Sequence, residues 1–123
     1  MEGPIRVLLV EDNEVYRESL VFLLSRYEGL EVVGAVGDGG SAAAACADLH
    51  ADVVVLDYRL PDLDGSEAAE DVHDGCPGAA VVFLSASAGQ DEYDAARRSG
   101  APLVRKDEGV DALVHAVRAA AGR

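Results

Sequence analysis

Five short apolar segments, spread along the whole chain, constrain the fold more than any other feature of the sequence. They are rich in valine and leucine, and most lack the alternation of apolar and polar residues that marks a strand with one solvated face. The segments are Ile5–Val10, Glu31–Val36, Val53–Leu56, Ala79–Leu84 and Pro102–Val104. Such continuous apolar strands are typical of a parallel sheet that helices cover on both faces.

Helical patterns lie between these segments. From Tyr16 to Tyr27, apolar side chains recur on one face of a helix, and Val110 to Val117 repeats that spacing. The alanine-rich segment Ser41–Leu49, together with Ser66–His73 and Asp91–Arg98, predicts three further helices. Strand and helix therefore alternate with short connections, which predicts an α/β fold with one open parallel sheet and right-handed crossovers.

Length and charge limit the classes of partner. A chain of 123 residues is long enough for one domain with its own core. The formal net charge is −13, from 23 acidic and 10 basic residues, so the chain itself should repel the phosphate backbone of a nucleic acid. No apolar segment approaches the roughly 20 residues that a membrane span requires, so no membrane partner is expected.

The N-terminal residues and the cysteines bear on the compartment. The sequence MEGPIRV lacks the basic start and long apolar stretch of a signal peptide, so we expect a cytoplasmic location. Two cysteines, Cys46 and Cys76, are too few for a disulfide framework or a four-ligand metal site. We therefore expect both to be buried free thiols.

Candidate site residues follow four of the five predicted strands. Glu11 and Asp12 come after the first strand, Asp57 after the third, Ser85 after the fourth and Lys106 just past the fifth. Lys106 is the only lysine among the 10 basic residues. Because ligands of open parallel sheets bind beyond the carboxyl ends of the strands, we expect these side chains to share one site.

Each of these residues alone has an ordinary structural explanation. An acidic pair after a strand can be a solvated turn or a helix cap, Asp57 can mark a strand exit, and Ser85 and Lys106 can lie in solvated loops. The combination favours a site, because separate strands deliver complementary groups to one edge. A lysine also offers a compact ammonium group, which the forked guanidinium of arginine does not.

The combined residue types point to phosphoryl transfer. Three converging carboxylates would repel one another and raise a pKa unless a cation lay among them, and Mg²⁺ prefers such oxygen ligands. A carboxylate can attack phosphorus to form an aspartyl phosphate, while a metal ion and an ammonium group balance the charge on the transferring oxygens.

Four segments, spread between residues 7 and 107, resemble the signature segments of the response-regulator receiver domain of two-component signalling. They are VLLVEDNEVYRESL, VVVLDYRLPDLDG, VVFLSAS and LVRKD. The resemblance implies a single flavodoxin-like (βα)5 receiver domain over residues 1–123, with a doubly wound sheet of strand order 2-1-3-4-5. It also implies a signalling domain rather than an enzyme, although such a domain assists its own phosphorylation and dephosphorylation.

The resemblance assigns roles to the acidic residues. Asp57 would be the phosphoacceptor. Asp12 would bind Mg²⁺ directly and Glu11 mostly through water. Asp57 itself and the backbone carbonyl of Arg59 would complete the protein ligands of the metal ion.

The resemblance also assigns roles around the phosphoryl group, which Ser85 and Lys106 would contact. Leu103, three residues before Lys106, stands where many receivers carry an aromatic residue that turns inward on activation, so the usual coupling is altered. Arg59 and Ser87 occupy positions at which family members vary the lifetime of the phosphoryl group. We expect the guanidinium of Arg59 to lie over that group and restrict attacking water; the alternative is a solvent-facing arginine.

The partners follow from the same resemblance. A sensor histidine kinase would be the phosphoryl donor, and the regulated output is expected to be transcriptional. The pair Lys106 and Asp107 resembles receivers that precede a helix-turn-helix domain, so DNA would be contacted only by a domain absent from this chain. A homodimer through the last two helices and last strand, or through the first and last helices, is a further expectation.

Three alternatives differ from a phosphorylation switch. A phosphatase of the haloacid-dehalogenase type needs a second aspartate two residues after the nucleophile, where Arg59 stands. A flavodoxin-like cofactor site needs a phosphate-binding loop after the first strand, where EDNE presents negative charge. A degenerate receiver that acts by protein contact without phosphorylation stays open, because the segment before Lys106 departs from the family's pattern.

Overall fold

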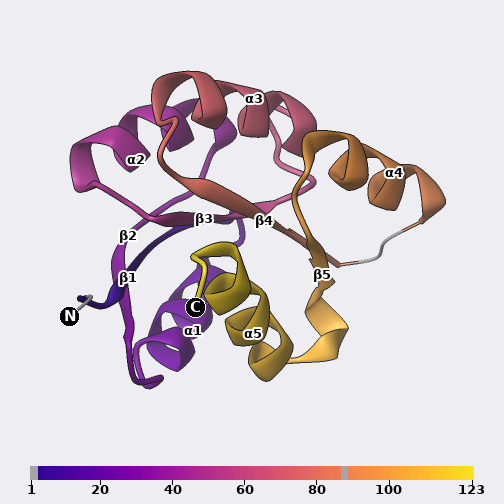
Figure 1. The fold of residues 1–123 in the computed structure, drawn as a ribbon. Coiled ribbons are helices and arrows are strands. Elements are labelled where there is room, and N and C mark those ends of the chain that lie inside the picture. The colour runs from indigo at the N-terminus through magenta and orange to yellow at the C-terminus, as the bar shows by residue number, and fades with distance from the viewer. Residues whose placement is uncertain (1–2, 87–88) are drawn as a thin grey trace.

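The five strands form one parallel sheet in the order β2-β1-β3-β4-β5. The computed structural model describes residues 3–86 and 89–123, and Figure 1 shows the sheet between two layers of helices. The strands are β1 (Ile5–Val10), β2 (Leu30–Val36), β3 (Val53–Asp57), β4 (Ala80–Ser85) and β5 (Leu103–Arg105). The predicted strand order is confirmed, and the predicted strand ends agree with the observed ones to within one residue.

Helices cover both faces of the sheet, as Figure 1 shows. α1 (Glu14–Leu24) and α5 (Val110–Ala120) lie on one face, and α2 (Ala42–Leu49), α3 (Gly65–Gly75) and α4 (Gln90–Ser99) lie on the other. Two 3-10 helices, η1 (Gly39–Ser41) and η2 (Lys106–Glu108), precede α2 and α5. α1 ends before Tyr27, which instead packs against the core from the loop that follows the helix.

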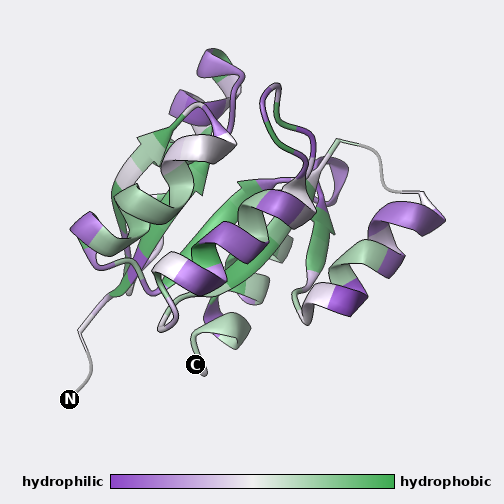
Figure 2. Ribbon diagram, turned by 90° about the horizontal axis from the view of Figure 1, so that it is seen from above, coloured by the Kyte–Doolittle hydropathy of each residue, from purple (hydrophilic) through white to green (hydrophobic). Residues whose placement is uncertain are grey.

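Side chains of the strands alternate between two cores, one on each side of the sheet. On β1, Val7 and Leu9 belong to the core under α1 and α5, whereas Leu8 and Val10 belong to the core under α2 and α3. All of β3 is buried. In Figure 2 the strands are largely hydrophobic, and α3 and α4 above them carry many hydrophilic residues, whereas the alanine-rich α2 is mostly hydrophobic. Burial on both faces explains why the strands are apolar without alternation.

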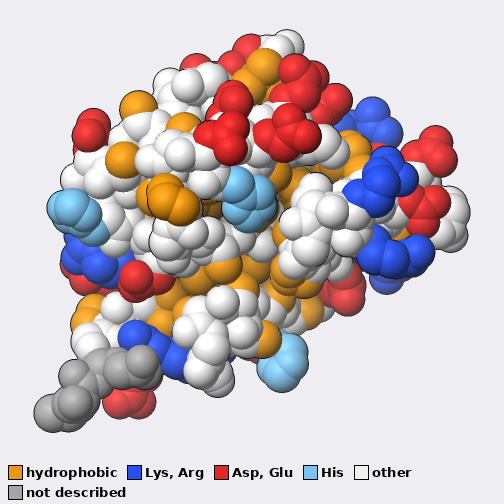
Figure 3. Space-filling model, turned by 45° about the horizontal axis from the view of Figure 1, so that its top comes forward, with side chains coloured by type: hydrophobic (Ala, Val, Ile, Leu, Met, Phe, Trp, Pro, Cys, Tyr) orange, Lys and Arg blue, Asp and Glu red, His pale blue; other side chains and the backbone are white. Residues whose placement is uncertain are grey.

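Acidic and basic side chains are unevenly distributed over the face that carries α2, α3 and α4. Figure 3 shows the side that carries α2, α3 and α4, where acidic side chains gather along the upper part and basic side chains lie toward the α4 end. In residues 3–86 and 89–123, every helix falls short of the length and apolar character of a transmembrane span.

Cys46 and Cys76 form a disulfide, so the prediction of free thiols is wrong. Cys46 lies on the buried side of α2, and Cys76 directly follows α3. Because α2 and α3 pack side by side, the two Cα atoms are 6.2 Å apart although the residues are separated by 30 positions. That Cα distance is within the range that a disulfide spans.

Gly65 begins α3 where the chain passes close to the residue after β3. A Cβ atom at this position would lie 2.8 Å from the Cα atom of Tyr58 and 3.1 Å from the ring of Phe83. We predict that Gly65→Ala lowers the free energy of unfolding by about 1–3 kcal/mol, the usual cost of overpacking. Gly78→Ala is the matched control, because a Cβ atom there meets nothing within 4 Å. Urea unfolding measures both, and equal stability of the two variants would contradict the prediction.

Candidate functional site

The carboxyl ends of four strands bring the predicted site residues to one edge of the sheet. Glu11 and Asp12 follow β1, Asp57 ends β3, Ser85 ends β4 and Lys106 follows β5. These four strands are neighbours in the sheet. The parallel topology therefore joins side chains that lie up to 95 positions apart in the sequence.

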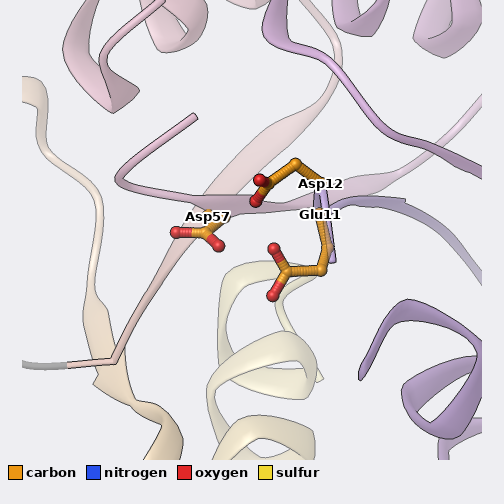
Figure 4. Close-up of side chains that lie close together, drawn as sticks. All are labelled: Glu11, Asp12 and Asp57. Atoms are coloured by element: carbon orange, nitrogen blue, oxygen red, sulfur yellow. The ribbon is translucent and has the colours of Figure 1, made fainter. Parts of the chain in front are cut away.

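Three carboxylates face one another at this edge. Glu11, Asp12 and Asp57 each place one carboxylate oxygen within 4.8 Å of those of the other two, and Figure 4 shows the three side chains directed into one space. Glu11 is 1% exposed and Asp57 is 5% exposed, whereas Asp12 lies at the surface. Like charges this close repel one another strongly where protein shields them from water.

Lys106 supplies the compensating positive charge. Its ammonium group donates hydrogen bonds to Glu11 Oε1 and, over 3.1 Å, to Asp57 Oδ2. The same group lies 4.4 Å from the centroid of the Tyr16 ring, a cation–π contact that α1 contributes. Burial lowers the pKa of Lys106, but the hydrogen bonds and charges of the two carboxylates outweigh burial and raise the pKa overall. The ammonium group is therefore held in its charged form.

One buried oxygen of Glu11 lacks a hydrogen-bond partner among the described residues. Oε1 accepts from Lys106, whereas Oε2 is paired with no group in the described part of the chain. Burial, and then the closeness of Asp57, raises the pKa of Glu11, although Lys106 opposes the shift. An unpartnered buried carboxylate oxygen is costly, and a hard divalent cation among the three acids would coordinate it. The residues present therefore fit an ion such as Mg²⁺.

Both oxygens of Asp57 are held in place. The backbone N–H of Arg59 donates to Oδ1 over 3.0 Å, and Lys106 donates to Oδ2. The guanidinium of Arg59 forms an ion pair with Glu92 on α4. Its expected position over a phosphoryl group stays a prediction.

Glu92 is a buried charge at the site that the sequence patterns did not reveal. It is 5% exposed, its Oε2 accepts a hydrogen bond from Ser85 Oγ over 3.1 Å, and its Oε1 contacts the guanidinium of Arg59. The available signal was its place on the same helix face as Ala95 and Ala96, the other buried residues of α4. That signal was hidden because acidic residues are common in the first turn of any helix.

Leu103 and Ser87 complete the set of predicted site residues. Leu103 begins β5 and is aligned with Phe83 of β4. Its partly buried side chain packs against the core under α2 and α3. An aliphatic side chain therefore occupies this position and offers no hydroxyl group. Ser87 lies outside the described residues.

Removing the ammonium group should leave the buried carboxylates without their cation. We predict that Lys106→Met lowers the free energy of unfolding by about 3 kcal/mol in metal-free buffer, the order of loss for breaking a buried ion pair. Arg105→Met is the matched control, because Arg105 makes an exposed ion pair with Asp107 that contributes about 1 kcal/mol or less. Chemical denaturation measures both losses. If the Lys106 variant lost no more stability than the Arg105 variant, the central role of Lys106 would be wrong.

Comparisons with known sequences agree with this geometry. The family model of the response regulator receiver domain matches residues 7–118. The chain is 37% identical over 117 residues to the probable transcriptional regulatory protein TcrX of Mycobacterium tuberculosis, a match that covers 94% of this chain and 49% of TcrX. The chain spans about half the length, or less, of the first curated relatives it matches.

Solved structures share the whole fold. The response regulator domain of Thermotoga maritima CheB superposes with a TM-score of 0.87 at 26% identity, over 98% of each chain. The signal receiver domain of the putative response regulator NarL from Mycobacterium tuberculosis has a TM-score of 0.84 at 29% identity, over 95% of this chain and 98% of that one. With the strand order, the acidic edge and these matches in agreement, the chain belongs to the response regulator receiver domain family.

Proposed function

We propose that this receiver domain is a phosphorylation-dependent switch whose phosphoacceptor is Asp57. The observation that carries the proposal is the hydrogen bond between Lys106 and Asp57 beside the unpartnered oxygen of Glu11. A purely structural ion pair needs one carboxylate for each lysine, whereas Lys106 pairs here with two of three clustered acids. The excess negative charge supports a site that receives a second cation and then a phosphoryl group.

Asp57 acts as the nucleophile in this proposal. One of its carboxylate oxygens attacks the phosphorus atom of a phosphohistidine on a sensor histidine kinase, and an O–P bond forms as the P–N bond breaks. The electron pair of the broken bond returns to the imidazole nitrogen. Lys106, which donates a hydrogen bond to Asp57 Oδ2, would neutralise charge on the transferred oxygens.

The acidic pocket, by which we mean the clustered carboxylates of Glu11, Asp12 and Asp57, would hold Mg²⁺. Asp12 and Asp57 would supply carboxylate oxygens, Glu11 would act mostly through water, and the backbone carbonyl of Arg59 would be a further ligand. When bound, the ion supplies positive charge to the transferring phosphoryl group. The clustering of the three carboxylates and the unpartnered Glu11 oxygen support this assignment.

The remaining residues would respond to the phosphoryl group. Ser85 would donate a hydrogen bond to it, and Arg59 and Ser87 would set its lifetime. Leu103 would change its packing in the core, since it has no phenol with which to form a new hydrogen bond. These roles extend those of the family to matching positions of this chain.

The output and the partners are proposed from the family. A sensor histidine kinase would donate the phosphoryl group in the cytoplasm, and a DNA-binding domain outside this chain would carry a transcriptional response, with homodimerisation at a helical face. The domain would catalyse no reaction on another substrate. A degenerate receiver without phosphorylation would leave the complete acidic set and its shared lysine unexplained.

Phosphorylation of Asp57 is directly testable. Incubation with Mg²⁺ and phosphoramidate should add one phosphoryl group to the wild-type chain, measured by intact-mass spectrometry. Asp57→Asn should abolish the addition, because an amide cannot form the acyl phosphate. Asp48→Asn, which changes an exposed aspartate of α2, should be modified like the wild type. An unmodified wild-type chain, or a modified Asp57→Asn variant, would refute the assignment.

The proposed metal site predicts a stabilising effect of Mg²⁺ alone. A ligand that binds only the folded state stabilises it by about 2.7 kcal/mol at 100 times its Kd. Thermal unfolding of the wild type should therefore shift upward with Mg²⁺, while Asp12→Asn should lose most of the shift because one ligand oxygen is gone. Asp48→Asn again serves as the control and should keep the full shift. A wild-type midpoint that is indifferent to Mg²⁺ would count against the metal site.

A further inference from the structure

We propose that Glu92 is a positioning residue that competes with the phosphoryl group of Asp57 for Ser85 and Arg59, so that phosphorylation releases the first turn of α4. The inference rests on the proposed function of Asp57 and names the element that would transmit it. It is carried by the polar contacts that join β4, the residues after β3 and α4 at the edge of the site.

Glu92 depends on both of its partners. Apart from the acidic pocket itself, Glu92 is the only charged side chain that is buried among the described residues. Among the described residues, its Oε2 accepts from Ser85 and its Oε1 pairs with Arg59. A buried carboxylate that loses a hydrogen-bond partner is destabilised, because the protein excludes the water that would replace it. Glu92 therefore stays buried only while these contacts last.

The hydroxyl group of Ser85 cannot satisfy Glu92 and a phosphoryl group together. A serine hydroxyl has one proton to donate, and Ser85 donates it to Glu92 over 3.1 Å. Ser85 lies at the end of β4, one residue past Leu84, which is aligned with Asp57 on the adjacent strand β3. A phosphoryl group on Asp57 therefore competes with Glu92 for that proton.

The phosphoryl group and Glu92 would also compete for the guanidinium of Arg59. It lies two residues past Asp57, and its backbone N–H already contacts that carboxylate. Its side chain is 74% exposed, whereas the side chain of Glu92 beneath it is 7% exposed. A phosphoryl group carries more negative charge than a carboxylate and binds guanidinium groups strongly. The new charge would attract Arg59 and repel Glu92.

Apart from Glu92, the described residues at the start of α4 bury little against the rest of the domain. The helix otherwise buries two small residues, Ala95 and Ala96, and its N-cap residue Gly89 makes no side-chain cap. By comparison, α5 buries one leucine and two valines. A hollow lined in part by Arg59 and the start of α4 adjoins the contact and gives the turn room to move. Loss of the Ser85 and Arg59 contacts would thus let Glu92 reach water.

The test titrates beryllofluoride with Mg²⁺, a mimic of the phosphoryl group, into the 123-residue chain. The apparent Kd is measured by NMR chemical shifts for the wild type, Glu92→Gln and Asp91→Asn. Asp91 is an exposed acid in the same turn of α4. Its variant removes the same charge from the helix terminus but no hydrogen bond to Ser85 or Arg59, so it controls for long-range electrostatics.

Glu92→Gln should bind beryllofluoride at least about 5-fold more tightly than Asp91→Asn, within the usual range of coupling between sites. The gain should shrink in a Ser85→Ala background, because the proton for which the two groups compete is then absent. Equal affinities of the Glu92 and Asp91 variants would overturn the inference. A gain of unchanged size in the Ser85→Ala background would also overturn it, since Glu92 would then act independently of Ser85.

Hydrogen exchange of the wild type provides a second readout that needs no variant. Saturation with beryllofluoride should speed amide exchange at residues 93–95, in the part of α4 next to Glu92, and leave α5 unchanged. Unchanged or slower exchange at residues 93–95, with beryllofluoride bound, would overturn only the role of Glu92. Failure of the wild type to bind beryllofluoride at all would overturn the proposed function of Asp57 and the inference with it.

Discussion

One ammonium group that pairs with two of three clustered carboxylates is the interaction on which the site depends. Lys106, which follows β5 and begins η2, donates to both Glu11 and Asp57, and its ammonium group also contacts the ring of Tyr16 on α1. The acids come from the ends of β1 and β3. The pocket therefore carries excess negative charge in the absence of a second cation, which suits it to a divalent ion.

Asp57 lies between two polar groups that differ in character. On one side, the acids and Lys106 would govern the transfer of the phosphoryl group. On the other, Ser85 and Arg59 both contact Glu92, which ties the end of β4 and the loop after β3 to α4. A change of charge at Asp57 acts on the second group by competition for hydrogen-bond donors. Through these contacts, a change of charge at Asp57 would alter the position of α4 at the protein surface without an aromatic residue at the position of Leu103.

The sheet and most of the site could be predicted from the sequence because a covered parallel sheet constrains both its strands and the residues that follow them. Strands buried on both faces must be apolar throughout. The residues that follow neighbouring parallel strands must lie at one edge of the sheet, so the sequence predicts that Glu11, Asp57 and Lys106 lie together. Glu92 was missed because an acid in the first turn of a helix is usually solvated. The Cys46–Cys76 disulfide was missed because it depends on how α2 and α3 pack, which the spacing of two cysteines does not encode.

The most direct test of the account is a crystal structure of the chain with Mg²⁺ and beryllofluoride, solved to a resolution that shows side-chain hydrogen bonds. The account predicts beryllofluoride on Asp57, Mg²⁺ among Glu11, Asp12 and Asp57, and Ser85 Oγ turned from Glu92 to a fluorine atom, with Glu92 moved toward solvent. A structure in which the ligand occupies Asp57 while Ser85 and Arg59 remain bonded to a buried Glu92 would contradict the link to α4. A structure with no ligand on Asp57 would contradict the account as a whole.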